Sequence, residues 1–137
     1  MPTVEEVMTR GVISIREDAF VEEAMKAMIE RHVSALIVEK ASEADIDGII
    51  TRKDIINKVI APGRDPKKIR VHEVMTKPLM TVTKKMDVMH VARLMARTEV
   101  RRFPVRECDR IVGIISNSDI FRAYVLDNVT EKKTKKP

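Results

Sequence analysis

The stretch Gly48-Ile49-Ile50-Thr51-Arg52-Lys53-Asp54-Ile55 decides the fold, because the chain repeats it as Gly113-Ile114-Ile115-Ser116-Asn117-Ser118-Asp119-Ile120. In each copy an apolar, β-branched run ends at a hydroxyl residue, which predicts the end of a buried strand. A hydroxyl with a carboxylate three positions later, followed by periodic apolar residues, predicts a capped helix. Each copy is therefore predicted to be a strand-to-helix junction, with Thr51 and Ser116 as N-caps.

Such a junction has two interpretations. The start of a helix leaves backbone N–H groups unpaired at the positive end of the helix dipole, where a phosphate can bind. The same residues also form a plain capping motif that starts a helix and binds nothing. The motif alone favours the plain cap, because caps are common and anion sites are few.

The repeat extends beyond this motif. A shift of 67 residues places Val7-Met8-Thr9 on Val74-Met75-Thr76, and a turn two residues longer in the first half then brings the two glycine motifs into register. Each half is predicted to have the order β-α-β-β-α after a short entry helix. The first half has an entry helix over 4–8, a strand over 12–15, a helix carrying Val21, Ala24, Met25, Met28 and Ile29, strands over 35–38 and 46–50, and the closing helix. The second half has an entry helix over 71–75, a strand over 79–82, a helix carrying Val88, Val91, Ala92 and Met95, strands over 102–105 and 111–115, and the closing helix.

The repeat sets the predicted domain limits. We expect a first repeat over residues 1–69, a second over 70–128, and a disordered Lys-rich tail over 129–137, with residues 61–66 as a linker too short to separate the halves. The last six residues carry four lysines, and without them the net charge falls from +5 to +1. The charge of the folded part is therefore nearly balanced, and the tail is expected to be solvated.

Composition excludes several classes of protein. With 44% hydrophobic and 34% charged residues the chain is globular, and no apolar run is long enough to span a membrane. The N-terminus lacks a signal-peptide pattern, so we expect a cytoplasmic protein without a membrane partner. The single Cys108 lies in a charged turn without a second cysteine, which indicates an incidental thiol.

No catalytic or metal-binding motif is recognisable. His32, His72 and His90 are scattered without metal-ligand spacing, and the chain has neither a nucleophile elbow nor a phosphate-binding P-loop. We therefore expect no enzyme, no catalytic residues and no metal site.

At this point the chain resembles a known family. The doubled element order, the Val-Met-Thr entry, Arg101-Arg102-Phe103-Pro104-Val105 and the doubled glycine motif are similar to a tandem pair of CBS domains, a Bateman module, over residues 1 to about 127. The resemblance implies an α+β fold of two CBS repeats related by pseudo-twofold symmetry and packed as one module. It also implies clefts between the repeats that bind AMP, ADP or ATP, with S-adenosylmethionine or NAD as further candidates, and no prosthetic group.

The resemblance also assigns roles to residues. Asp54 and Asp119 match the carboxylate that takes the two ribose hydroxyls, a role that suits the lone pairs of a carboxylate. Thr51 and Ser116 match the hydroxyl that meets the phosphate at the helix start. The remaining positions are the first-strand residues that line the adenine pocket and the basic pair that reaches the phosphates in some members: Ser14, Ile15, Thr81 and Val82, and Arg101 and Arg102.

The two repeats differ at the basic pair. Ser34 and Ala35 stand in the first repeat where Arg101 and Arg102 stand in the second. Adjacent strand residues point to opposite faces, so we expect one of the two arginines to face the cleft. The Asp54 cleft therefore lacks its own phosphate-binding arginine, unless Arg52, Lys53 or an arginine from the other half reaches in. A phosphorylated ligand is expected to prefer the Asp119 cleft, because guanidinium binds phosphate well.

These observations leave three functions in competition. The leading one is a regulatory module that senses an adenosine nucleotide and signals to an unidentified protein partner in trans. A nucleic-acid-binding protein that uses its basic surface and tail is an alternative, although three Phe and one Tyr provide few stacking residues. The third is a dimerisation scaffold with degenerate clefts. The resemblance implies a homodimer, since members of the family commonly pair their modules. In support, the closing helices carry more aliphatic residues than one helix face needs: Ile55, Ile56, Val59, Ile60, Ile120, Tyr124 and Val125.

Overall fold

A computed structural model describes residues 2–77 and 80–130 of the chain, and its residues form two compact units. We call residues 13–79 the Asp54 unit, and residues 1–12 together with 80–137 the Asp119 unit. These limits differ from the predicted repeats of 1–69 and 70–128, because each entry segment belongs to the unit that contains the other repeat's glycine motif.

The Asp54 unit is a three-stranded sheet with helices. Its sheet order is β1-β2-β3, with β1 parallel to β2 and β2 antiparallel to β3. Its elements are β1 (Ser14–Arg16), α2 (Val21–Arg31), β2 (Ala35–Glu39), β3 (Gly48–Thr51), α3 (Arg52–Ile55), the π-helical turn η1 (Ile56–Ile60) and the 3₁₀ turn η2 (Val71–Glu73).

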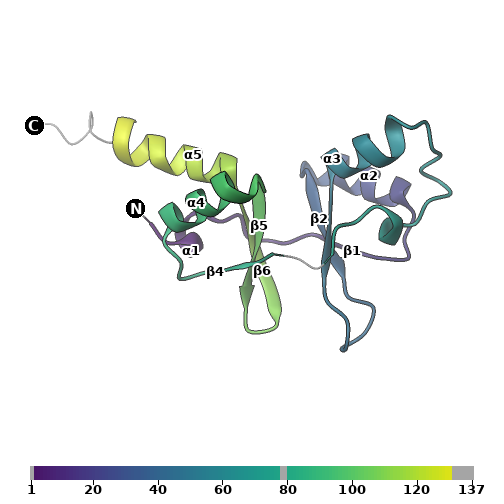
Figure 1. Ribbon diagram of the computed structural model, residues 1–137, viewed down its shortest axis with the longest axis horizontal. Coiled ribbons are helices and arrows are strands. Elements are labelled where there is room, and N and C mark those ends of the chain that lie inside the picture. The colour runs from purple at the N-terminus through teal and green to yellow at the C-terminus, as the bar shows by residue number, and fades with distance from the viewer. Residues whose placement is uncertain (1, 78–79, 131–137) are drawn as a thin grey trace, which may run out of the picture. The chain divides into compact units, whose positions relative to one another are not determined.

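The Asp119 unit repeats this architecture. Its sheet order is β4-β5-β6, again with one parallel and one antiparallel pair. Its elements are α1 (Val4–Val7), β4 (Val82–Thr83), α4 (Val88–Thr98), β5 (Arg102–Glu107), β6 (Arg110–Ser116), α5 (Asn117–Val125) and the π-helical turn η3 (Leu126–Thr130). Figure 1 shows α4 and α5 beside the β5–β6 hairpin, whose turn projects away from both helices. The α+β fold of two repeats is confirmed.

Each unit has its own aliphatic core. In the Asp54 unit, Val21, Ala24 and Met28 of α2 pack with Leu36, Val38 and Ile50 of the sheet. In the Asp119 unit, Val88 and Val91 of α4 pack with Phe103, Val105 and Ile115. The spacing of three to four residues along each helix places these side chains on one face, as predicted. Ile29 was predicted for the same stripe, but it is 77% exposed.

The two entry segments pair with the glycine motifs. Thr9 forms an antiparallel bridge with Ile114, and Thr76 forms the corresponding bridge with Ile49. A Cβ on Gly113 would lie 2.8 Å from the carbonyl oxygen of Thr9, and a Cβ on Gly48 would lie 3.1 Å from that of Thr76. A close approach of backbone therefore favours glycine at both positions, and most strongly at Gly113.

Several predicted boundaries need correction. The first strands begin at Ser14 and Val82, and β3 begins at Gly48 where a strand from residue 46 was predicted. Helical conformation continues through η3 to Thr130, so the tail cannot begin at residue 129. Leu79, from the predicted strand over 79–82, lies outside the described residues, and so do residues 131–137 of the predicted tail. Among residues 2–77 and 80–130, no helix combines the length and apolar character that crossing a membrane requires.

Candidate functional site

The Asp54 junction is a reciprocal cap. The hydroxyl of Thr51 accepts a hydrogen bond from the N–H of Asp54 at 3.1 Å, and Oδ2 of Asp54 accepts one from the N–H of Thr51 at 3.0 Å. The Thr51 hydroxyl also donates to Oδ2 at 2.8 Å. All three bonds form within four residues at the end of β3, so the predicted cap is confirmed.

The Asp119 junction has the same cap with additional neighbours. The hydroxyl of Ser116 accepts from the N–H of Asp119 at 3.2 Å, and Oδ2 of Asp119 accepts from the N–H of Ser116 at 2.9 Å. Oδ1 of Asp119 lies 3.5 Å from the hydroxyl of Thr9 and 3.5 Å from a guanidinium nitrogen of Arg122. Asp119 is buried, at 9% exposure, and thus has compensating polar contacts on both oxygens.

Strand register places one arginine beside the Ser116 cap. Arg102 is the partner of Ser116 across β5 and β6, and Ala35 is the partner of Thr51 across β2 and β3. Directly opposite residues of an antiparallel pair have neighbouring side chains on one face. The difference between the repeats thus lies next to the cap hydroxyl.

Arg101 occupies a different position. It is exposed and precedes β5, and its carbonyl oxygen accepts a hydrogen bond from the N–H of Asn117 at 2.9 Å. Its counterpart Ser34 makes the same bond to the N–H of Arg52, also at 2.9 Å. In each unit, one residue of this hydrogen-bonded pair is therefore an arginine. In the Asp119 unit it is Arg101, which precedes β5, and in the Asp54 unit it is Arg52, which begins α3.

The first-strand residues do not join the caps. Ser14 pairs with Ile37, two residues along β2 from the partner of Thr51, and its hydroxyl donates to Glu39 at 2.8 Å. Ile15 packs on the core of the Asp54 unit, and Val82 is buried in the core of the Asp119 unit. Thr81 is half-buried just before β4. Within the described part of the chain, neither cap carboxylate accepts a hydrogen bond from any of these four residues.

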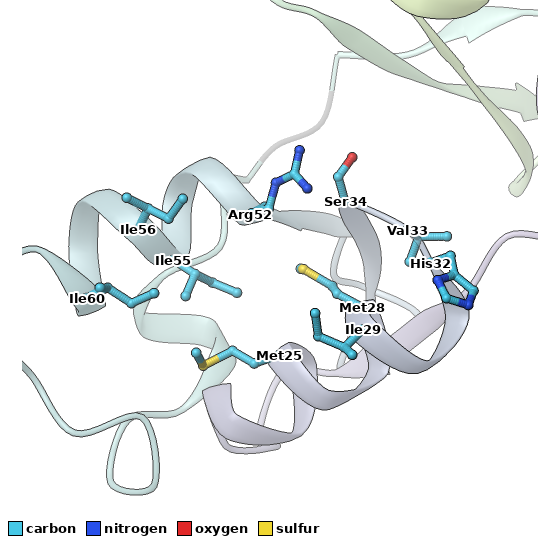
Figure 2. Close-up of a pocket in the computed structure, with 10 residues that line it drawn as sticks. All are labelled: Met25, Met28, Ile29, His32, Val33, Ser34, Arg52, Ile55, Ile56 and Ile60. Atoms are coloured by element: carbon cyan, nitrogen blue, oxygen red, sulfur yellow. The ribbon is translucent and has the colours of Figure 1, made fainter.

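A groove follows the helices of the Asp54 unit. It is a cavity of about 520 Å³ between α2 and the segment formed by α3 and η1. Figure 2 shows Arg52 and Ser34 at one side of it and isoleucine side chains from both helical segments along it. Its lining residues are Met25, Met28, Ile29, His32, Val33, Ser34, Arg52, Ile55, Ile56 and Ile60.

Charged side chains tie loops to the sheet away from the caps. Nζ of Lys77 lies 2.7 Å from Oδ2 of Asp45 and 3.3 Å from Oε2 of Glu17. The hydrogen bond with Lys77 lowers the pKa of Asp45, and the same bond raises the pKa of Lys77. In the Asp119 unit Lys84 pairs with Glu107, which lowers the pKa of that carboxyl group. The Lys77 and Lys84 ion pairs stabilise the segments at the strand ends and do not include the cap residues.

Two residues near the candidate site were not predicted from the sequence: Thr9 and Arg122, which contact the Asp119 carboxylate. Arg52, named as a possible phosphate ligand of the Asp54 cleft, lines the groove beside Ser34. The contact of Arg122 with Asp119 was predictable, because residues three positions apart on a helix are neighbours on its surface. The contact of Thr9 was not predictable from sequence spacing, since Asp119 lies 110 residues away. Within the described part of the chain, His, Cys, Asp and Glu side chains form no group of three that could hold a metal ion.

Comparisons with known proteins match the repeated pattern. A family model described as the CBS domain matches residues 4–61 and again residues 71–126. The mitochondrial CBS domain-containing protein CBSX3 of Arabidopsis thaliana is 35% identical over 117 residues, which cover 83% of this chain. The match spans 57% of the length of the plant protein.

Solved structures share the fold. A hexameric CBS-CP12 protein from bloom-forming cyanobacteria has 41% identity and a TM-score of 0.84, covering 100% of this chain and 76% of that one. The CBS domain pair of protein MJ0100, solved in complex with 5′-methylthioadenosine and S-adenosyl-L-methionine, has 28% identity and a TM-score of 0.78. That match covers 93% of this chain and 99% of the other.

Proposed function

The chain belongs to the CBS domain family as a tandem pair, a regulatory module, and we propose that it binds an adenosine-containing ligand at its two capped junctions. The observation that carries the proposal is the reciprocal cap at both Asp54 and Asp119, which fixes a carboxylate at the start of a helix in each unit. The MJ0100 pair, bound to two adenosine compounds, supports this ligand class.

The carboxylates are proposed to take the ribose. A carboxylate has about four lone-pair sites, so two hydroxyls can bind it while one backbone N–H remains bound. Among the described residues, Oδ1 of Asp54 accepts no hydrogen bond, whereas Oδ1 of Asp119 is near Thr9 and Arg122. Ribose binding at Asp119 therefore requires a rearrangement of Arg122, and ribose binding at Asp54 does not.

The cap hydroxyls and the basic residues are proposed to take a phosphate. Ser116 has Arg102 opposite it on the neighbouring strand, and Thr51 has Ala35 there. AMP, ADP and ATP are consequently the proposed ligands of the Asp119 junction, with S-adenosylmethionine and NAD as further candidates. For Ser14, Ile15, Thr81 and Val82 the proposal retains backbone contacts with the adenine, since the side chains of Ile15 and Val82 pack in the cores.

The proposed consequence of binding is regulatory. CBS domain proteins are generally regulatory and not enzymes, and we extend this to the present chain, with signalling to a protein partner in trans and a cytoplasmic location as further parts of the proposal. A phosphate bound at the hydroxyl of Thr51 or Ser116 competes with the hydrogen bond that this hydroxyl accepts from the backbone, so it changes the start of α3 or α5. A coupling of about 1–3 kcal/mol is enough for such a switch. Self-association, as in the hexameric cyanobacterial relative, is part of the proposal as a homodimer.

Calorimetric titration of the purified chain tests the ligand class. AMP, ADP, ATP, S-adenosylmethionine and NAD are each titrated at the same protein concentration, with GMP as the control for base recognition. We expect saturable heat with at least one adenosine compound and a much weaker response to GMP. A flat response to all five would overturn the ligand-sensing proposal and leave the scaffold as the remaining function.

A further inference from the structure

An arginine contacts the carboxylate that is proposed to take the ribose in the Asp119 unit. A guanidinium nitrogen of Arg122 lies 3.5 Å from Oδ1 of Asp119, and the two residues are three positions apart on α5. Asp119 is buried, whereas the side chain of Arg122 is 67% exposed. The fold therefore holds the carboxylate in place, while the guanidinium lies largely in water and can change position by rotation of its side chain.

The Asp54 unit has no arginine at the equivalent position. Asn57 stands three residues after Asp54, as Arg122 stands three residues after Asp119, and Asn57 is exposed. An amide carries no charge, so Asn57 cannot form an ion pair with the Asp54 carboxylate. The two junctions share their caps but differ at this position of the closing helix.

We propose that Arg122 makes the Asp119 junction selective for 5′-phosphorylated adenosine ligands. When ribose binds, the guanidinium leaves the Asp119 carboxylate and binds the phosphate of the same ligand. The inference rests on the proposed function, in which Asp119 takes the ribose and the Ser116 cap takes the phosphate. It adds the residue that makes binding depend on the charge of the ligand, and it leaves the Asp54 junction, with Asn57, open to uncharged adenosine compounds.

The ribose and Arg122 compete for the same oxygen. Oδ2 of Asp119 accepts the N–H of Ser116, while Oδ1 is the oxygen near Arg122 and the hydroxyl of Thr9. A ligand without phosphate displaces the guanidinium and offers it no new anionic partner. A phosphorylated ligand replaces an exposed ion pair, which is weak, with a charge-assisted contact to phosphate, which is stronger. The charge of the ligand therefore decides whether the exchange is favourable.

The distance to the phosphate position is short enough for the exchange. One carboxylate separates the guanidinium from the cap, because Oδ1 of Asp119 lies 3.5 Å from Arg122 and Oδ2 is bound to the N–H of Ser116 at 2.9 Å. An arginine side chain is long and has five N–H donors, so it can pass from one side of a carboxylate to the other while the helix stays in place. Arg102 lies opposite Ser116 on the neighbouring strand, so a phosphate there would be within reach of a strand arginine and a helix arginine.

Exchange of the two equivalent residues tests the proposal. Arg122→Asn gives the Asp119 junction the residue of the Asp54 junction, and the change is made in an Asp54→Ala chain so that the Asp119 site alone reports. AMP and 5′-methylthioadenosine are titrated by calorimetry into the chain with and without Arg122→Asn. We expect AMP to bind about tenfold more weakly, at the low end for a charge-assisted bond because Arg122 is exposed, while 5′-methylthioadenosine binds as well or up to about threefold more tightly.

Two further variants separate this selectivity from a structural role. Arg122→Lys keeps a positive charge without the guanidinium and should retain part of the preference for AMP. Asn57→Arg, in an Asp119→Ala chain, should raise the preference of the Asp54 site for AMP over 5′-methylthioadenosine by about threefold or more. The advantage that Arg122 gives to AMP should also shrink with added salt, because an exposed guanidinium is screened.

The outcomes distinguish the inference from the proposed function. Equal losses for both ligands in Arg122→Asn would mean that the arginine only supports the carboxylate or the helix, and an unchanged ratio of the two affinities would mean that it takes no part in selection. Either result, with adenosine compounds still bound by the wild-type chain, would overturn the inference alone. A wild-type chain that binds no adenosine compound would overturn the proposed function and this inference together.

Discussion

The hydroxyl of Thr9 lies 3.5 Å from Oδ1 of Asp119, and the two residues are 110 positions apart in the sequence. The entry segment brings them together, because Thr9 pairs with Ile114 two residues before the Ser116 cap. The Val-Met-Thr entry of the first repeat therefore supports the carboxylate of the second repeat. This contact joins the N-terminal segment of the Asp119 unit to the carboxylate of its candidate ligand site.

Removal of the Thr9 hydroxyl should weaken ligand binding at Asp119. Thr9→Val keeps the size of the side chain and removes a long, part-buried hydrogen bond to the carboxylate. A net contribution of about 0.5–1.5 kcal/mol corresponds to roughly two- to tenfold in affinity, and the 3.5 Å distance places the effect at the lower end. Thr76→Val is the control, since Thr76 is exposed and its side chain makes no hydrogen bond among the described residues. Equal effects of both changes on AMP titrations would contradict the positioning role.

The repeated glycines should differ in their tolerance of a methyl group. In Gly113→Ala the new Cβ would meet the Thr9 carbonyl oxygen at 2.8 Å, and in Gly48→Ala it would meet the Thr76 carbonyl oxygen at 3.1 Å. Overpacking against backbone costs typically about 1–3 kcal/mol, and we expect the Gly113 variant at the upper part of this range. Urea denaturation measures both. A Gly113 variant as stable as the wild type would mean that the entry segment moves aside freely.

The Lys77 network should make stability depend on pH. The pKa of Asp45 is lowered by its bond to Lys77, so this contribution is present above the unfolded pKa of about 3.9 and is lost as the pH falls through the lower folded value. The pKa of Lys77 is raised, so its contribution is complete below about pH 10.4 and is lost as the pH rises through the folded value. Lys77→Met should therefore lower the thermal midpoint at neutral pH by more than at about pH 2.5. A difference that is the same at both pH values would exclude this network as its cause.

Arg102 should distinguish charged from uncharged ligands. If it reaches the phosphate beside Ser116, Arg102→Ala loses a charge-assisted hydrogen bond of about 1.5–3 kcal/mol, or roughly ten- to a hundredfold in AMP affinity. Binding of 5′-methylthioadenosine, which has no phosphate, should change little in the same variant. Both ligands are titrated into both proteins. Equal losses for the two ligands would indicate damage to the fold rather than loss of a phosphate contact.

The sequence predicted the features that local chemistry determines. The caps at Thr51 and Ser116 depend on residues three positions apart, and the doubled element order follows from a visible repeat. The exchange of the entry segments was not predictable, because the bridge from Thr9 to Ile114 depends on the tertiary course of the chain. Periodicity placed Ile29 on the apolar stripe of its helix, yet it could not show how wide a strip the sheet covers.

In the candidate site, too, local motifs were predictable and tertiary neighbours were not. The cap residues were found by motif, and the register of β5 and β6 decided that Arg102 is the arginine opposite Ser116. Arg52 was predicted only as a possible phosphate ligand, and its place in the groove depends on how α2 packs beside α3. Of the seven closing-helix residues expected to drive assembly, Ile55 and Val59 are buried in their own core, while Ile56, Ile60 and Tyr124 remain exposed. Sequence spacing identifies apolar residues but not which neighbour covers them.

The most direct test of the account is calorimetric titration of AMP into the Asp119→Ala and Asp54→Ala variants. Both carboxylates are proposed to bind ribose, and only the Asp119 junction has an arginine opposite its cap hydroxyl. We predict that Asp119→Ala removes the tighter AMP site and that Asp54→Ala leaves it largely intact, with a modest effect of added salt because Asp119 is buried. Loss of tight binding in Asp54→Ala with full retention in Asp119→Ala would contradict the assignment of the phosphate site, and unchanged binding in both would contradict the role of the caps altogether.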